Sequence, residues 1–416
     1  MENSIMKRKI YIFTRTSRAA NYGIGTYIDQ LILCLKNTEI DFDLICLYSK
    51  RKEVEITNEN GYRKISIPSV PIRTKMDSYY YVRNVVYLLN DLIIEDKNVL
   101  NIFHLNFMNS LDLVTCLKKM FRCKIILVIH YTTWTFSLLG DYNQLKLLWE
   151  QSSSKRNISQ NKLIKEFKED LKMIKKCDQL VCVARHTLLP FVELADIDIK
   201  NCMVISNSLK DQYRDMNKNE KLFIREKYNI PLHTKIIFFA GRLDEVKGIY
   251  DLIKAFKELM KNRKDIHLVI AGDGDFNNLI SLAGDNCFNI TFTGRLSKEE
   301  LYLFYNMSNI GVIPSLCEEF GFVAIEMMMH ALPIIVSDTG GLAEIVEDGI
   351  GGLKVPIVKI KDKRSIQISV LIEKINYLLE NEEYACELGK RGRKIFLEKY
   401  ELKNFRDKIL NLYKNV

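Results

Sequence analysis

The sequence predicts an α/β protein built from two Rossmann-like, doubly wound domains that face each other across a cleft. Short runs rich in Ile, Val and Phe recur along all 416 residues, as expected for strands buried on both faces of a parallel sheet. Longer helical stretches separate these runs, which is the alternation that builds doubly wound sheets. A hydrophobic content of 47% with only 7 prolines excludes a disordered or collagen-like chain.

The strand-like runs fall into two sets. In the first half we expect strands at Arg8–Thr14, Phe42–Tyr48, Val99–Leu105, Lys124–Ile129, Gln179–Ala184 and Cys202–Ser206. In the second half we expect them at Lys235–Ala240, Ile266–Ala271, Asn289–Phe292, Asn309–Ile313 and Pro333–Val336. Helices are expected between them, for example at Thr26–Leu35, Asn161–Lys176, Ile249–Asn262 and Lys298–Asn306.

The boundary between the domains is predicted near residue 208. The stretch Lys210–Lys221 has almost no apolar side chains and the composition of a linker. We therefore expect an N-terminal domain at 1–208 and a C-terminal domain at 209–393. The amphipathic stretch 394–416 follows all the strands of the second set, and we expect it to cross back onto the first domain.

Membrane-spanning, disulfide-rich and zinc-binding classes are disfavoured by composition. No run approaches the 18 uncharged apolar residues that span a bilayer, and Ile10–Phe13 is too short for a signal-peptide core. The ten cysteines are scattered, without a C-x-x-C pair or a close Cys/His set. These features predict a reducing, cytoplasmic location.

The positive charge is concentrated in the N-terminal half. Residues 1–210 hold 31 Lys and Arg against 22 Asp and Glu, while the remainder is balanced. The surplus points to an anionic substrate or surface, although solvated lysines without a function explain it equally well. No nucleic-acid-binding motif accompanies it. Residues 151–180 hold eight basic side chains at amphipathic spacing, which fits a helix on the inner membrane face and also a helix packed on the core.

The densest chemical signal is the segment Ser315–Glu326, which follows a predicted strand and opens a helix. Ligands of α/β folds bind at such strand ends, and the amides near Phe320 and Gly321 would face an anion at the helix start. Glu318 and Glu326 lie roughly 10 Å apart along this segment, and carboxylates accept hydrogen bonds from sugar hydroxyls. The alternative is that Glu326 is a surface residue and Glu318 only a partner of the helix dipole.

A second cluster follows the predicted strand at Lys235–Ala240. Gly241 makes a turn, and Arg242 and Lys247 could converge on one pair of phosphates. Taken alone, such a segment is more often a solvated loop.

Together these motifs resemble those of the retaining glycosyltransferases of family 4, the glycosyl transferases group 1, which have the two-domain GT-B fold. The matching segments cover nearly all of residues 202–350 in the expected order. They are the E-x-F-G-x-x-x-x-E motif from Glu318 to Glu326, Leu332–Val346, Gly241-Arg242 with Lys247-Gly248, Ala271–Gly274, Phe292–Arg295 and Val204–Asn207.

By this resemblance Glu326 would bind the nucleotide ribose and Glu318 the donor sugar, while Arg242 and Lys247 would neutralise the diphosphate. Thr293–Leu296 would lie near the base. The donor-binding residues expected in the C-terminal domain are Gly241, Arg242, Lys247, Gly272, Gly294, Arg295, Glu318, Phe320, Gly321, Phe322 and Glu326. The residues expected to act in catalysis are His130, Glu318, Arg242 and Lys247.

The N-terminal half resembles the family more loosely. Asn21–Thr26 is similar to the family's glycine loop, with Gly23 and Gly25 letting a donor phosphate or an acceptor approach the backbone. The third glycine of a dinucleotide fingerprint is missing, which disfavours NAD. His130 matches the family's histidine near the transferred sugar, although a lone histidine at a strand end is otherwise more often structural. The next residue is Tyr131 where the family has Asp.

The function implied is transfer of a sugar from a nucleotide-diphosphate sugar, with UDP the commonest base in the family, to an acceptor hydroxyl with retention of configuration. The acceptor would be a saccharide, a lipid-linked glycan or a peptide, in the synthesis of cell-surface glycans or glycoconjugates. No cofactor or metal is expected, because basic side chains can replace the cation. The chain has three D-x-D triplets, which hold a metal ion in another glycosyltransferase fold. Asp41–Asp43 and Asp196–Asp198 are interpreted as solvated caps, and Asp273–Asp275 lies in a glycine turn. Three alternatives remain: a sugar-nucleotide epimerase, a phosphorylase, and a silent nucleotide-sugar-binding subunit.

Overall fold

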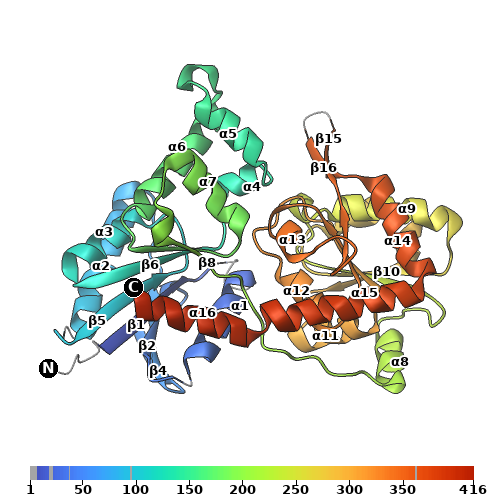
Figure 1. Ribbon diagram of the computed structural model, residues 1–416, viewed down its shortest axis with the longest axis horizontal. Coiled ribbons are helices and arrows are strands. Elements are labelled where there is room, and N and C mark those ends of the chain that lie inside the picture. Colours follow the sequence, from blue (N-terminus) through green and yellow to red (C-terminus); the bar gives the residue numbers. More distant parts are fainter. Residues whose placement is uncertain (1–6, 18–21, 37, 94–95, 361–362) are drawn as a thin grey trace. The chain divides into compact units, whose positions relative to one another are not determined.

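The computed structural model describes residues 7–17, 22–36, 38–93, 96–360 and 363–416. The chain divides into two compact units (Figure 1). The first comprises Met1–Asn207 together with Phe405–Val416, and the second comprises Ser208–Asn404. Each unit is an α/β domain with its own sheet, as the sequence predicts; that the domains face one another across a cleft stays a prediction.

The first unit contains an eight-stranded sheet in the order β3-β4-β2-β1-β5-β6-β7-β8. All neighbouring strands are parallel except β3 and β4. The six strands expected in this half are all present, and β5 has the predicted bounds. The strands are β1 (Lys7–Arg15), β2 (Asp41–Ser49), β3 (Glu55–Glu59), β4 (Tyr62–Pro68), β5 (Val99–Leu105), β6 (Cys123–Ile129), β7 (Gln179–Cys182) and β8 (Cys202–Val204).

The hairpin of β3 and β4 is absent from the predicted strands. Asn60 and Gly61 form its turn, and both have positive φ angles, 38° and 98°. A two-residue turn of this kind matches the twist of the flanking strands, and Asn-Gly is its strongest sequence signal. The strands themselves escaped prediction because β3 alternates half-buried and exposed residues and so lacks the continuous apolar run of a buried strand.

Helices cover both faces of this sheet. They are α1 (Gly23–Leu35), α2 (Lys75–Leu92), α3 (Leu111–Met120), α4 (Thr133–Ser137), α5 (Tyr142–Glu150), α6 (Ile158–Ile174), α7 (Arg185–Ala195) and α16 (Leu402–Asn415). The apolar stripe of α6, formed by Ile164, Phe167, Leu171 and Ile174, is buried in the core. Of the two alternatives for this basic helix, the structure therefore favours packing on the core, and its apolar face is not available to lipid.

The C-terminal helix α16 returns to the first unit and packs beside α1 (Figure 1). The buried ring of His104 in β5 joins the two helices: the Tyr27 hydroxyl of α1 lies 3.2 Å from Nε2, and the Tyr413 hydroxyl of α16 lies 2.7 Å from Nδ1. Phe405 also packs edge-on against Tyr27. The returning segment is shorter than the expected 394–416, because residue 394 still belongs to α15 (Glu382–Ile395) and the first unit takes up the chain only from Phe405.

The second unit has a six-stranded parallel sheet in the order β11-β10-β9-β12-β13-β14, with a separate hairpin of β15 and β16. The five expected strands are present, and β9 and β10 have the predicted bounds. The strands are β9 (Lys235–Ala240), β10 (Ile266–Ala271), β11 (Ile290–Gly294), β12 (Ile310–Ile313), β13 (Ile334–Ser337), β14 (Leu353–Val355), β15 (Ile357–Ile360) and β16 (Lys363–Ile366).

The helices of this unit are α8 (Lys218–Lys227), α9 (Ile249–Asn262), α10 (Phe276–Ala283), α11 (Lys298–Met307), α12 (Phe322–Met329), α13 (Gly340–Ile345), α14 (Ile368–Glu380) and α15. The expected linker 210–221 is only partly irregular, because α8 begins inside it at Lys218. Asn217 caps that helix, and Glu220 completes a capping box, which the polar composition concealed. No helix among the described residues is long and apolar enough to cross a membrane.

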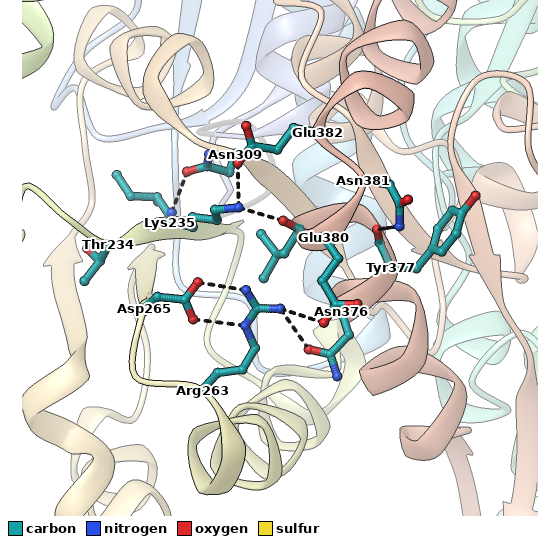
Figure 2. A network of polar contacts seen from close by, with 12 residues as sticks. Thr234, Lys235, Arg263, Asp265, Asn309, Asn376, Tyr377, Glu380, Asn381 and Glu382 are labelled. Atoms are coloured by element: carbon teal, nitrogen blue, oxygen red, sulfur yellow. Dashed lines mark hydrogen bonds and ion pairs between the residues drawn. The ribbon is translucent and has the colours of Figure 1, made fainter.

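A polar network ties the amino ends of β9 and β10 to α14 and α15 (Figure 2). Arg263 forms a two-pronged ion pair with Asp265, at 3.0 and 2.8 Å, and a third contact with Glu380 at 3.2 Å. Lys235 donates to the Leu379 carbonyl at 2.7 Å. These contacts lie at the edge of the sheet opposite to the carboxyl ends of its strands, so they serve the packing of the domain and leave the other edge for ligands.

The buried histidine at the junction of α1 and α16 makes stability depend on pH. Burial lowers the pKa of His104 to about 3, whereas an unfolded histidine titrates near 6.5. Between these values the unfolded chain binds one more proton than the folded chain, so stability falls as the pH drops below about 6.5. At pH 5 the loss is about 2 kcal/mol for one such histidine.

We therefore expect His104→Gln to reduce the difference in unfolding free energy between pH 7.5 and pH 5 by about 2 kcal/mol. Urea unfolding at the two pH values measures this difference, which is independent of any general destabilisation by the substitution. His233→Gln, at an exposed position, is the matched control and should behave as the wild type. An unchanged difference in the His104 variant would contradict the burial of a neutral imidazole.

Candidate functional site

The strand order of the second unit brings two predicted motifs together. β9 pairs with β10 on one side and with β12 on the other, so the order reverses between β9 and β12. In doubly wound sheets, ligands bind at the carboxyl ends of strands at such a switch point. The loops after β9 and β12 meet there, and the Leu316 N–H donates to the Val246 carbonyl at 2.8 Å.

An ion pair lies between these loops. Lys247 Nζ donates to Glu318 Oε2 at 2.6 Å, and the Ser315 hydroxyl donates to the same oxygen at 3.2 Å. The side chains of Lys247 and Glu318 are each 19% exposed, so both keep a path to solvent. Arg242 lies in the same loop and pairs with Asp244 at 3.2 Å. Two residues expected to act on phosphate and sugar are therefore in contact, 71 positions apart in sequence.

The start of α12 forms the floor of this site. Gly321 precedes the helix with φ +112°, a conformation that side-chain-bearing residues rarely adopt. The first N–H groups of a helix have no acceptor within it, and those of α12 begin at Phe322 beside the ion pair. The helix dipole adds a favourable potential for an anion. Phe320, Gly321 and Phe322 therefore lie at this helix start, and binding of an anion by them stays a prediction.

The loop after β13 locks this floor in place. The Gly341 N–H donates to the Glu318 carbonyl at 2.8 Å, and the Ser337 hydroxyl donates to the Ser315 carbonyl. A Cβ atom at Gly341 would lie only 2.2 Å from the Phe320 carbonyl oxygen. Gly341 is therefore required because two backbone segments approach closely there. The loops after β9, β12 and β13 together form one site.

Glu326 lies inside the unit rather than on its surface, with 7% of the residue exposed. The Tyr305 hydroxyl of α11 donates to its Oε2 at 3.0 Å. Burial raises the pKa of Glu326, against the opposing effects of Lys298 and the Tyr305 hydroxyl. The surface alternative is therefore wrong. Tyr305 was not predicted, because nothing in the sequence indicates which aromatic residue of α11 meets a carboxylate on α12.

The predicted glycines shape the neighbouring loops. A Cβ at Gly272 would lie 1.8 Å from the Gly241 carbonyl oxygen, and the Gly272 N–H donates to the Gly294 carbonyl at 2.9 Å. The ends of β9, β10 and β11 are thereby stacked closely. Arg295 follows this stack directly after β11, so it lies at the same edge of the sheet as Arg242.

The first unit holds the remaining predicted residues. Gly23 and Gly25 form the first turn of α1 instead of a loop before it, and Asn21 lies outside the described residues. His130 directly follows β6, and its Nε2 lies 3.1 Å from Asn106 Oδ1. Asn106 was not predicted, although its place directly after the strand Val99–Leu105 was an available signal.

The contacts of Asn106 fix the protonation of His130. Its amide nitrogen donates to the Phe13 carbonyl at 3.1 Å, which leaves only an acceptor oxygen for the imidazole. The hydrogen of the neutral ring therefore sits on Nε2, and Nδ1 carries the lone pair. Burial, and secondarily His104, lower the pKa of His130 to about 3. At neutral pH this ring can accept a hydrogen bond through Nδ1 but holds no proton to give from it.

The aspartate triplets have structural roles. Asp43 is buried and pairs with Arg63 at 2.6 Å, which corrects its interpretation as a solvated cap. Asp198 caps a short helix, and Asp275 caps α10. Within the described part of the chain, no group of three or more His, Cys, Asp or Glu side chains could hold a metal ion.

Residues 220–395 match the family described as Glycosyl transferases group 1. We call residues 220–395 the group 1 segment. The group 1 segment contains the Lys247–Glu318 pair, the start of α12 and Glu326. The uncharacterized glycosyltransferase MJ1607 of Methanocaldococcus jannaschii is 31% identical over 219 residues, which are 51% of this chain and 53% of that protein. The chain thus matches about half the length of this relative.

Solved structures resemble the chain beyond the group 1 segment. Sucrose-phosphate synthase from Thermosynechococcus elongatus superimposes with a TM-score of 0.76 at 19% identity, over 98% of both chains. Anabaena HepE, solved in complex with UDP-glucose, gives a TM-score of 0.71 at 14% identity, over 98% of this chain and all of the other. These similarities show the fold, and the α/β, GT-B class predicted from the sequence is confirmed.

The contact between Gly341 and Phe320 can be tested by substitution. Gly341→Ala must displace the Phe320 backbone, and we expect a destabilisation of about 2 kcal/mol. Gly284→Ala is the matched control: a Cβ there meets nothing within 4 Å, so only its positive φ should cost about 1 kcal/mol. Urea unfolding measures both values. Equal stability of wild type and Gly341→Ala would contradict the tight junction.

Proposed function

We propose that the chain is a retaining glycosyltransferase of family 4 that transfers a sugar from a UDP-sugar to an acceptor hydroxyl without a metal ion. The observation that carries the proposal is the Lys247–Glu318 pair beside the start of α12, at the switch point of the group 1 segment. A cation, helix N–H groups and an acceptor-only carboxylate within one short span suit a sugar diphosphate.

The choice of UDP rests on the similar structures. HepE was solved with UDP-glucose, and a trehalose-phosphate synthase described as UDP-forming shares the fold at a TM-score of 0.69. Glu326 lies within α12, eight residues after Glu318, and its carboxylate is oriented by the Tyr305 hydroxyl. We assign it to the ribose hydroxyls, because a buried carboxylate gains from two neighbouring donors.

In the proposed reaction, the bond from the anomeric carbon to the diphosphate oxygen breaks as the acceptor oxygen bonds to that carbon from the same face. The acceptor proton passes to the departing phosphate oxygen. Lys247, Arg242 and the α12 amides stabilise the charge that develops on the diphosphate. When the donor binds, its phosphates replace Glu318 as the ionic partner of Lys247. The freed carboxylate can then accept a hydrogen bond from a sugar hydroxyl. His130 accepts a hydrogen bond from a further hydroxyl through Nδ1.

We propose a cytoplasmic enzyme of cell-surface glycan or glycoconjugate synthesis, with a saccharide, a lipid-linked glycan or a peptide as acceptor. The alternatives give different products from the same donor. An epimerase would convert one UDP-sugar into another, a phosphorylase would need inorganic phosphate, and a silent subunit would bind the donor without releasing UDP. Product analysis by NMR separates these outcomes and reports the configuration of the anomeric carbon.

Binding of UDP tests the site directly. We expect Lys247→Met to weaken UDP about tenfold or more, because one charge-assisted hydrogen bond to phosphate is lost. Lys261→Met is the matched control, since Lys261 lies exposed on α9 and pairs with Glu258 of the same helix at 2.7 Å. Calorimetric titration without divalent metal gives the affinities.

Two results would overturn the proposal. One is a wild-type protein that binds no UDP, GDP or ADP-sugar in metal-free buffer, measured by calorimetry and by the melting temperature. The other is an equal loss of affinity in the Lys247 and Lys261 variants, which would place the phosphates elsewhere.

A further inference from the structure

Arg15, at the carboxyl end of β1, is a half-buried cation that the proposed reaction does not use. Its Nη2 donates to the Asn109 carbonyl at 3.3 Å. Its guanidinium lies over the Phe107 ring, 3.9 Å from the centroid, and 5.7 Å from the centroid of Tyr48. Its Nε is buried without a hydrogen-bond partner. The side chain is therefore held by aromatic rings and one carbonyl, with donors left over.

Among the described residues, no carboxylate oxygen lies within 4.0 Å of Arg15. Arg156 and Arg225 also lack one, but each donates to at least two backbone carbonyls, whereas Arg15 donates to one. Burial lowers the pKa of Arg15, which reflects the free energy lost when a charge is withdrawn from water without an ionic partner. Three other partly buried arginines each hold a two-pronged pair with an aspartate: Arg63 with Asp43, Arg263 with Asp265 and Arg393 with Asp211.

Arg15 and His130 lie at the same edge of the sheet. In the register of β1, β5 and β6, Phe13 pairs with Leu105 and Leu105 pairs with Leu127. Arg15 comes two residues after Phe13, and His130 comes three residues after Leu127. Two strand spacings of about 4.8 Å separate their strands, or roughly 10 Å in all. An acceptor of the size of one sugar could reach both side chains.

Tyr131, the residue after His130, is compatible with an anion bound at Arg15. Tyr131 is one of three tyrosines that raise the pKa of Arg15 against the larger, lowering effect of burial, and it is 36% exposed. An aspartate at this position would pair with the guanidinium and repel an incoming anion, whereas the neutral Tyr131 side chain does neither. The charge surplus of residues 1–210 adds an attractive field for anions.

We infer that Arg15 binds a phosphate or carboxylate group carried by the acceptor, so that the acceptor substrate of this enzyme is anionic. The inference rests on the proposed function, and it defines the chemistry of the acceptor that the transferase reaction leaves open. The guanidinium fork matches either group with two parallel hydrogen bonds. Phe107 and Tyr48 shield the pair from water, and the anion offsets the desolvation of the cation.

The test measures anion binding to protein saturated with UDP, so that the phosphate-binding loops of the second unit are occupied. Glucose 6-phosphate, glucuronate and uncharged glucose are the probes. We expect one or both anions, but not glucose, to raise the melting temperature of the wild type. Arg15→Gln should weaken the anion about tenfold or more, and Arg15→Lys should restore only part of the affinity.

Arg122→Gln is the matched control, because Arg122 is exposed and precedes β6 at the opposite edge of the sheet. It should bind the anion as the wild type does. Without ligand, Arg15→Gln should melt at the same temperature as the wild type or higher, since an unpaired buried charge is removed. A purely structural arginine would instead lower the melting temperature when replaced.

Vesicles distinguish a soluble anion from a lipid head group. Flotation with phosphatidylglycerol but not phosphatidylcholine vesicles, lost in Arg15→Gln and kept in Arg122→Gln, would assign the anion to a lipid-linked acceptor. Absence of any Arg15-dependent binding to the sugar anions and to the vesicles overturns the inference. Intact UDP binding in that case leaves the proposed function standing, whereas loss of UDP binding by the wild type overturns the function itself.

Discussion

The ion pair of Lys247 and Glu318 is the contact on which the candidate site depends. It joins the loops after β9 and β12, the two strands between which the sheet order reverses. Both side chains are largely withdrawn from water, so separating them without a replacement would leave two poorly solvated charges. The Glu318 carbonyl also accepts the Gly341 N–H. The side chain of one residue and its backbone thus fix three strand ends relative to one another.

The sequence predicts this site to the level of the loops but not of the contacts. β5, β9 and β10 have the predicted bounds because runs buried on both faces show no ambiguity of period. The hairpin β3–β4 and the short strand β14 lack such runs. Lys247 and Glu318 were both expected at strand ends, yet their contact depends on β9 and β12 being neighbours, which local pattern does not encode. Partners such as Tyr305 and Asn106 come from the same long-range packing.

One imidazole ring joins two helices of the first unit. His104 connects α1 with α16 through two tyrosine hydroxyls, and a neutral ring with one donor and one acceptor nitrogen suits two hydroxyls that can each play either part. Tyr27 also packs edge-on against His130, with ring centroids 4.5 Å apart. The C-terminal helix therefore contacts Tyr27, and Tyr27 in turn contacts His130.

The candidate anion-binding side chains of the two units differ in their ionic partners. Lys247 is already paired, so an incoming phosphate must exchange with Glu318, and the net gain is the difference between two ionic contacts. Such an exchange favours a ligand with high charge, as a diphosphate has, and leaves a freed carboxylate that can accept hydroxyl donors. Arg15 has no carboxylate to exchange among the described residues, and its cost of burial is already present in the folded protein. A single negative charge is enough to relieve that cost, and aromatic walls favour a ligand that presents a flat or compact anion. Under the proposed assignments, the difference in pairing favours a diphosphate at the loops of the second unit and a phosphate or carboxylate group at Arg15, from the same kind of strand-end loop.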